Sequence, residues 1–167
     1  DALDSLLAQD YERFELIISD NASTDETEAI CRAYAERDDR IRYHRNPSTI
    51  APYQNFSGLV TLARGDLFMW TAHDDVWEPG FVGALVGALV AEPKAVLAFS
   101  QFDNIDDSGQ RVRVFRRDWG RIFRRPKIVQ YAAMVLLNEY RTQKANHVYG
   151  LMRKEALVAG GCLVGTS

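Results

Sequence analysis

The architecture of this 167-residue chain is set by the stretch Leu16-Ile17-Ile18-Ser19-Asp20-Asn21-Ala22-Ser23-Thr24-Asp25. Its first half, with the two residues before it, is a short apolar run rich in β-branched side chains, which is typical of a strand buried on both faces. The polar second half is typical of a loop at the end of such a strand. The stretch therefore predicts a buried strand over residues 14–19 that leads into a polar loop.

Predicted strands and predicted helices alternate along the chain on both sides of this stretch. Ser23 and Glu26 have the spacing of a capping box, which predicts that a helix begins at Ser23. The predicted strands cover residues 14–19, 41–45, 67–71, 95–102 and 147–152, and the predicted helices cover residues 1–8, 23–34, 52–63, 79–89 and 128–138. Strands that alternate with helices of this length predict an α/β fold in which helices flank a mostly parallel sheet.

Length and composition limit the class of protein. The chain is long enough for one compact domain and too short for two ordinary ones. Its 47% hydrophobic and 26% charged residues exclude a disordered, collagen-like or coiled-coil protein, and the net charge of -3 argues against nucleic acid as a partner. Cys31 and Cys162 fit neither a metal-binding spacing nor a disulfide framework, which favours a reducing, cytoplasmic location. The longest apolar stretch, Phe81–Ala91, is shorter than the ~20 residues that a membrane span needs.

Polar residues beyond the carboxyl ends of strands carry most weight, because ligands of open α/β sheets bind there. Asp20 and Asn21 leave the first predicted strand, where a carboxylate and an amide could hydrogen-bond a base or a ribose. The alternative is that this segment only starts the next helix, with Asp25 at its positive end. Taken alone, the residues favour helix capping over ligand binding.

A second polar cluster, His73-Asp74-Asp75, follows the strand predicted at residues 67–71. Two adjacent carboxylates repel each other unless they are solvated, protonated or bridged by a cation. Mg²⁺ or Mn²⁺ suits them, since such an ion takes few protein carboxylates and completes its shell with water and phosphate oxygens. One aspartate would then bind the metal while its neighbour holds a sugar or ribose hydroxyl. A polar turn with two solvated acids fits the residues equally well.

Three pieces of the sequence together resemble the family 2 glycosyltransferases, which have the GT-A fold. They are residues 16–25, the segment Ala63-Arg64-Gly65-Asp66, and the segment Trp70-Thr71-Ala72-His73-Asp74-Asp75. Their order and separation match the family over residues 2–107. The first piece resembles a D-D-G-S-T-D loop that binds the nucleotide base, with Asp20 in the first acidic position and Asn21 in the second.

This resemblance implies a set of site residues. Asp20, Asn21, Arg64 and Asp74 would contact the nucleotide-sugar donor, and Asp75 would hold Mg²⁺ or Mn²⁺ against its diphosphate. A metal in that place offsets the charge that develops on the departing diphosphate. Many relatives have another acid where this chain has a histidine, and we assign no role to that side chain.

The resemblance also implies a domain that is incomplete at both ends. Relatives begin with an apolar strand that precedes the first residue here, and inverting relatives use an acidic general base beyond the stretch that resembles residues 149–153. A matching acid would lie beyond Ser167, so the catalytic residue is unknown. We expect one partial GT-A domain over residues 1–167, with a nucleotide-sugar-binding part at 1–107 and the start of an acceptor-side part at 108–167.

Residues 111–127 interrupt the alternation with a basic, aromatic composition. Such a segment could rest on an anionic membrane surface and bring a cytoplasmic enzyme to a lipid-linked acceptor. An irregular, solvated surface with its aromatic residues anchored in the core is the alternative. The basic residues are Arg111, Arg113, Arg116, Arg117, Arg121, Arg124, Arg125 and Lys127, with Phe115, Trp119 and Phe123 among them.

From these features we expect an inverting, metal-dependent glycosyltransferase of polysaccharide or cell-envelope glycan synthesis. It would move a sugar from a nucleotide-sugar donor, with UDP-sugars the first candidates, to an acceptor hydroxyl on a glycan or a lipid-linked glycan. One alternative is a nucleotide-sugar-binding module without turnover. The other is a nucleotidyltransferase, which usually carries a glycine-rich phosphate loop after its first strand, and this sequence has none.

Overall fold

The structure of the protein, a computed structural model, describes residues 1–114 and 148–160. These residues belong to two compact units. The first unit contains residues 1–98 and the chain from Leu151 onward, and the second contains residues 99–150. Each unit is described by itself below.

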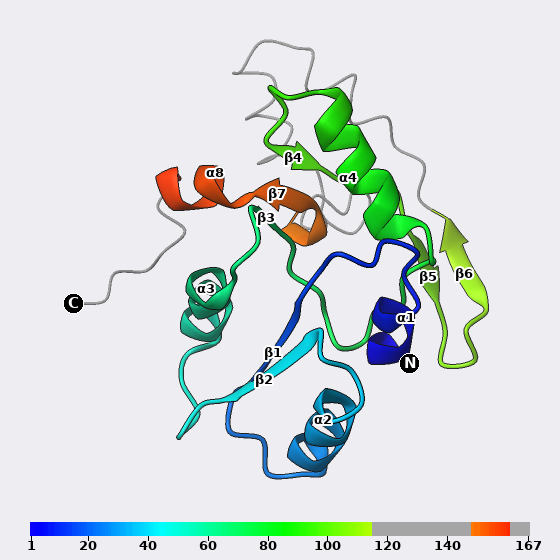
Figure 1. Cartoon of the computed structure of the whole chain (residues 1–167). Helices are drawn as coiled ribbons and strands as arrows, with labels where there is room; N and C mark the ends of the chain where they lie inside the picture. Colours follow the sequence, from blue (N-terminus) through cyan, green and yellow to red (C-terminus); the bar gives the residue numbers. More distant parts are fainter. Residues whose placement is uncertain (115–147, 161–167) are drawn as a thin grey trace, which may run out of the picture. The chain divides into compact units, whose positions relative to one another are not determined.

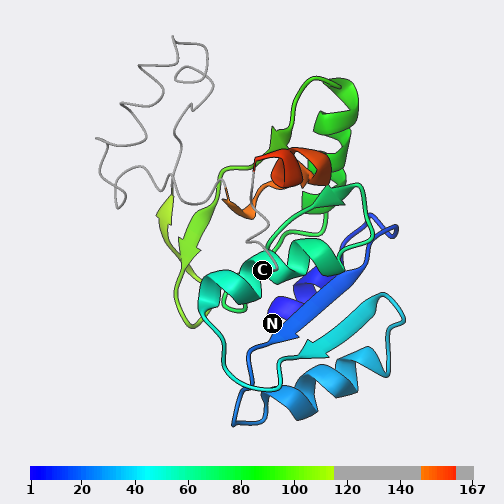
Figure 2. The ribbon, with the colours of Figure 1, turned by 90° about the vertical axis from the view of Figure 1, so that its left-hand side faces the viewer.

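Two parallel strands and two helices form the half of the first unit that carries the Asp20 loop. β1 (Leu16–Asp20) pairs with β2 (Ile41–Arg45) in a parallel register that sets Asp20 opposite Arg45. α2 (Thr27–Ala35) makes the crossover between them, and α3 (Pro52–Leu62) follows β2. Figures 1 and 2 show α2 and α3 on opposite sides of the strand pair. Because the strands are parallel, the loops after both of them begin at the same edge.

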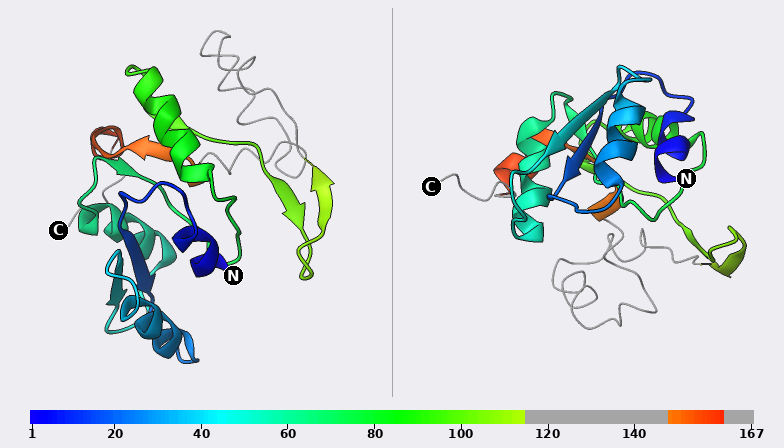
Figure 3. Two further views of the ribbon diagram at one scale, coloured as in Figure 1. Left: turned by 45° about the vertical axis from the view of Figure 1, so that its right-hand side comes forward. Right: turned by 90° about the horizontal axis from the view of Figure 1, so that it is seen from below.

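The other half of the first unit is built around a short antiparallel strand. β7 (Leu151–Arg153) lies between β3 (Leu67–Phe68) and β4 (Leu97–Ala98) and is antiparallel to both, so β3 and β4 run in the same direction. α4 (Phe81–Ala91) packs beside β7, as Figure 3 shows. Leu85 and Leu89 of α4 are buried with Leu151, which makes these three residues the core of this half.

Two further helices complete the first unit. α1 (Ala2–Leu7) buries Leu6 and lies at the start of the chain. α8 (Lys154–Ala159) follows β7, and the Lys154 Nζ donates to the carbonyl of Ala63 at 2.8 Å, which joins α8 to the end of α3.

The described part of the second unit contains a hairpin. β5 (Asp103–Ile105) pairs with β6 (Arg111–Val114) in an antiparallel register. Asp106 closes the turn, because its Oδ1 accepts hydrogen bonds from the backbone N–H groups of Ser108 and Gln110 at 2.9 and 3.0 Å. Gly109 has a φ of +78°, a conformation that favours glycine.

The predicted α/β fold is confirmed, and some element boundaries are corrected. α2 begins at Thr27 and not at Ser23, because the Ser23 N–H is used by the Asp20 carboxylate and so cannot start a capping box. The strand predicted at 67–71 is reduced to Leu67–Phe68, which pair with Arg153 and Met152 of β7. The strand predicted at 95–102 is reduced to Leu97–Ala98.

The end of the chain also departs from the expected elements. The strand predicted at 147–152 is Leu151–Arg153, and α8 after it was not predicted. The helix predicted at 128–138 and most of the basic segment at 111–127 lie outside the described residues. Among residues 1–114 and 148–160, no helix is both long enough and apolar enough to cross a membrane.

Candidate donor-binding site

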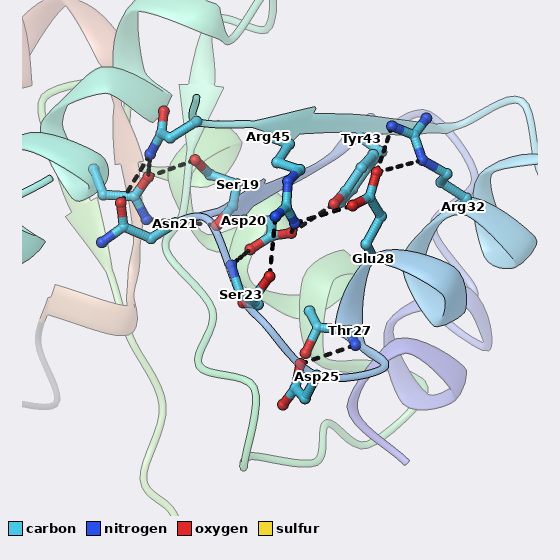
Figure 4. Close-up of polar contacts among 12 residues, drawn as sticks. Ser19, Asp20, Asn21, Ser23, Asp25, Thr27, Glu28, Arg32, Tyr43 and Arg45 are labelled. Atoms are coloured by element: carbon cyan, nitrogen blue, oxygen red, sulfur yellow. Dashed lines mark hydrogen bonds and ion pairs between the residues drawn. The ribbon is translucent and has the colours of Figure 1, made fainter. Parts of the chain in front are cut away.

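Asp20 is the buried centre of the loop that follows β1. Its carboxylate accepts three hydrogen bonds: Oδ1 from the Ser23 N–H at 2.8 Å, and Oδ2 from the Tyr43 hydroxyl at 2.6 Å and from Arg45 Nη1 at 2.9 Å (Figure 4). The residue is 3% exposed. Both carboxylate oxygens are therefore engaged by the protein, and Asp20 fixes the shape of the loop from within.

The electrostatics of Asp20 follow from these contacts. Burial raises the pKa of the carboxyl group, but the hydrogen bonds from Ser23 and Tyr43 and the charge of Arg45 outweigh burial and lower the pKa to about 2. Asp20 is consequently an anion at neutral pH, and the loop is closed by a charge-assisted set of hydrogen bonds.

Arg45 extends the same network to the rest of the loop and to α2. Its Nη2 donates to the carbonyl of Ser23 at 3.0 Å, and its Nη1 lies 3.1 Å from Glu28 Oε2. The loop also contains Ala22 with a φ of +61°, a left-handed conformation that alanine rarely adopts. At the end of the loop, Asp25 Oδ1 accepts from the Thr27 N–H at 3.0 Å, as expected of an acid at the start of α2.

Asn21 fastens a second loop to the first. Its amide makes two hydrogen bonds with the backbone of Ile50, donating from Nδ2 to the carbonyl at 2.9 Å and accepting from the N–H at 3.0 Å. The buried Asn46 donates to Asn21 at 3.1 Å and to Asn55 of α3 at 2.8 Å. Asn55 in turn accepts from the hydroxyl of Ser19 at 2.6 Å. The loop after β2 and the start of α3 are thus held against the end of β1.

Sequence reasoning did not identify Tyr43, Arg45, Asn46 and Asn55, although a signal for two of them exists. Tyr43 and Arg45 are two residues apart at the end of a strand, so their side chains share one face. In a parallel pair with β1, that spacing brings both side chains to the acid that ends β1.

The structure does not bring Arg64 to this edge. The Arg64 N–H donates to Glu15 Oε1, and Glu15 immediately precedes β1, whereas Asp20 is the last residue of that strand. Five residues of strand span roughly 16 Å. This contact places the backbone of Arg64 near the start of β1, and a role of its side chain in holding the nucleotide stays a prediction.

His73, Asp74 and Asp75 lie on the exposed segment that leaves β3. Local burial raises the pKa of Asp75, and the neighbouring charge of Asp74 raises it further, against an opposing effect of His73. The start of this segment is tied to α3, because Trp70 Nε1 donates to the carbonyl of Phe56 at 3.0 Å. α3 contacts the end of β1 through the residue before Phe56, so Trp70 and the end of β1 both contact the N-terminal half of α3.

The donor set suits a hard divalent cation only in part. No group of three or more histidine, cysteine, aspartate or glutamate side chains converges as a metal site within residues 1–114 and 148–160. Two adjacent, exposed carboxylates nevertheless match Mg²⁺, which binds through one or two protein carboxylates and fills its shell with phosphate oxygens and water. The residues therefore fit a metal that arrives with a diphosphate, and they do not fit a metal held by the protein alone.

A polar edge of this kind on an α/β sheet is typical of proteins that bind nucleotide-like ligands. The sequence model of glycosyl transferase family 2 matches residues 1–157, and the chain belongs to that family.

Two curated relatives each match 71% of the chain. An uncharacterized glycosyltransferase of Rickettsia felis is 30% identical over 122 residues, which cover 71% of this chain and 19% of the relative. Protein y4gI of Sinorhizobium fredii is 31% identical over 121 residues, which cover 71% of this chain and 13% of the relative. The chain thus spans less than a fifth of the length of either relative.

A solved structure confirms the fold. The crystal structure of Staphylococcus aureus TarS, residues 1–349, in complex with UDP superposes with a TM-score of 0.67 at 16% identity. The superposition covers 96% of this chain and 44% of the TarS chain.

Proposed function

We propose that this chain forms the donor-binding part of an inverting glycosyltransferase that transfers a sugar from a nucleotide-sugar, with UDP-sugars the first candidates. The observation that carries the proposal is the family match over residues 1–157. The UDP in the similar TarS structure supports the choice of nucleotide. Membership of this family also argues against the nucleotidyltransferase alternative.

The two polar clusters would contact different parts of the donor. The loop shaped by Asp20 and Asn21 would receive the nucleoside, since its residues Thr24 and Asp25 are exposed while the side chains of Asp20 and Asn21 are engaged by the protein. Asp74 would hold a ribose or sugar hydroxyl, and Asp75 would hold Mg²⁺ or Mn²⁺ at the diphosphate. When bound, the cation would offset the negative charge that develops on the departing diphosphate.

The acceptor side of the reaction is part of the proposal but has fewer residues to support it. Inversion requires a general base within hydrogen-bond reach of the acceptor hydroxyl. We assign no described residue to that role. A glycan or a lipid-linked glycan remains the proposed acceptor, and peripheral membrane contact through residues 111–127 remains a proposal for how it would be reached.

Calorimetric titration tests the donor site directly. UDP, GDP and dTDP are titrated into the full chain with and without Mn²⁺, first as nucleotides and then as sugar conjugates. We expect Mn²⁺ to strengthen binding of one nucleotide by at least about tenfold, and we expect Asp75→Ala to remove that gain. Asp39→Ala is the matched control, because Asp39 is exposed and lies before β2, at the end of the strand remote from the site.

Two outcomes would contradict the proposal. Metal-dependent binding that survives in Asp75→Ala would remove Asp75 from the site, and an equal loss in Asp39→Ala would show that the effect is not local. A transfer assay on a longer protein separates an enzyme from a binding module, because donor binding alone is common to both.

A further inference from the structure

The segment that carries the two carboxylates is held at its far end by α1 and the residues that follow it. The Trp77 N–H donates to the hydroxyl of Ser5 at 3.2 Å, and the Asp10 N–H donates to the carbonyl of Pro79 at 3.0 Å. Figure 3 shows α1 beside the chain that leads into α4 in both of its views. The beginning of the protein is thus bound to residues 77–79, directly after Asp75.

Gln9 is the centre of this attachment. Its side chain is buried, with the residue 5% exposed, and it makes three hydrogen bonds to the backbone. Nε2 donates to the carbonyls of Ser5 at 3.1 Å and Glu78 at 2.8 Å, and Oε1 accepts from the Val82 N–H at 2.9 Å. Both amide hydrogens and the amide oxygen are therefore used.

The contact with Val82 replaces a missing helix cap. α4 begins at Phe81, and its N-cap residue is Gly80, which has no side chain to accept a hydrogen bond from the first turn. Gln9 Oε1 accepts from the second residue of the helix instead. One buried amide thus fixes both the start of α4 and the carbonyl of Glu78 that precedes it, which sets the direction of the chain between them.

Glycine at position 83 allows this close approach. A Cβ atom at Gly83 would lie 3.1 Å from Asp10 Oδ1, which is tighter than ordinary van der Waals contact. The residue after Gln9 therefore packs directly on the first turn of α4.

The segment that carries the two carboxylates is consequently held in place at both of its ends. Upstream, Trp70 is buried and bonded to α3; downstream, Trp77 is buried and bonded to Ser5. Asp74 and Asp75 lie on the exposed chain between these two tryptophans. A ligand that needs both carboxylates in one geometry would lose affinity if either end were released, because the segment would have to be ordered on binding.

We infer that Gln9 is a positioning residue for metal-dependent donor binding, which makes the α1 end of the chain a functional part of the site. The inference rests on the proposed function, since it assumes that Asp75 and Asp74 hold the cation and the donor. Gln9 itself touches neither; it acts through Glu78 and Val82.

The test compares Gln9→Met with Arg153→Met in the full chain. Gln9→Met keeps the side-chain volume and removes all three hydrogen bonds. Arg153 donates from Nε to the carbonyl of Ala95 and from Nη2 to that of Leu89, both at 2.9 Å, so its replacement loosens the opposite end of α4. UDP affinity is measured by calorimetry with and without Mn²⁺, below the melting temperature of each variant.

We expect Gln9→Met to reduce the gain in UDP affinity from Mn²⁺ by about tenfold or more, while affinity without metal changes by less than about twofold. Hydrogen exchange over residues 71–82, measured without metal, should accelerate in the same variant. Arg153→Met should keep the Mn²⁺-dependent gain.

Every other result contradicts either this inference alone or both this inference and the proposed function. A wild-type gain that persists in Gln9→Met, or an equal loss in Arg153→Met, would overturn the inference and leave the proposed function in place. A wild-type protein without any gain from Mn²⁺ would overturn both. If Gln9→Met does not fold, Gln9→Asn serves as a second variant, since it keeps a neutral amide that is one methylene too short to reach the Glu78 carbonyl and the Val82 N–H together.

Discussion

At the scale of single residues, the buried Asp20 carboxylate ties the stability of the first unit to pH. Its pKa of about 2 lies below the ordinary value of 3.8, so its contribution is present above pH 4 and is lost as the pH falls toward 2. We expect Asp20→Asn to cost about 2 kcal/mol of unfolding free energy at pH 7. Denaturant unfolding of the two proteins at a series of pH values should show this difference shrinking between pH 4 and pH 2.

Asp39→Asn is the control for that measurement. Asp39 is exposed, so its replacement should change stability by less than about 0.5 kcal/mol at every pH. A difference for Asp20→Asn that stays constant down to pH 2 would contradict the depressed pKa.

Ala22 stores strain in the loop that Asp20 shapes. Its φ of +61° costs L-amino acids about 1 kcal/mol and costs glycine almost nothing. Ala22→Gly should therefore raise the unfolding free energy by about 0.5–1 kcal/mol, although the freer unfolded chain offsets part of the gain. Ala88→Gly, at an exposed position within α4, should lower the unfolding free energy by a similar amount. Thermal melts of both variants check these signs. A shift of the two melting temperatures in the same direction would contradict the prediction.

At the scale of elements, α3 and α4 each contain an interior glycine that no contact requires. A Cβ at Gly58 or at Gly87 would have no heavy atom within 4 Å. We expect Gly58→Ala and Gly87→Ala each to add about 0.5–1 kcal/mol of stability, because alanine has the higher helix propensity. Gly109→Ala is the opposite case, since its φ of +78° should make that substitution destabilising. Melting temperatures of the three variants check these signs.

The sequence predicted elements best where a single physical signal controls them. The strand at residues 41–45 matches β2, in which Ile41 is buried and on which α2 packs. The start of α2 was wrong because Asp20, seven residues before that helix, competes for the Ser23 N–H. β3 and β4 both pair with β7, which is remote from them in sequence, and local patterns do not contain this tertiary information.

Some residues of the candidate site could also be proposed from the sequence, and others could not. Asp20, Asn21, Asp74 and Asp75 stay predicted site residues, chosen because they follow strands, where ligands of α/β sheets bind. The roles of Asp20 and Asn21 as internal anchors depend on Arg45 and Ile50, whose proximity follows from the parallel register and from the loop path. Arg64 precedes a strand, and that position alone argues for the remote edge.

At the scale of the whole molecule, stability should differ between the two strand pairs described. β1 and β2 are covered by α2 and α3, whereas β5 and β6 form a two-stranded hairpin with Ile105 and Val112 exposed. Two strands alone are marginally stable in water. We expect amide hydrogens of the hairpin to exchange at least about tenfold faster than those of β1 and β2, measured by hydrogen exchange with mass spectrometry. Equal protection in both pairs would contradict this.

The attachment of Gln9 also has a consequence for the order in which the chain folds. Gln9 and Glu78 are 69 residues apart, and the intervening chain contains β1, α2, β2, α3 and β3. Closing so long a loop is entropically unfavourable until the intervening elements have condensed. The contact therefore belongs to the last steps of folding, and its loss should accelerate unfolding while refolding keeps its rate. The segment that bears Asp74 and Asp75 would then form late and open early within residues 1–98.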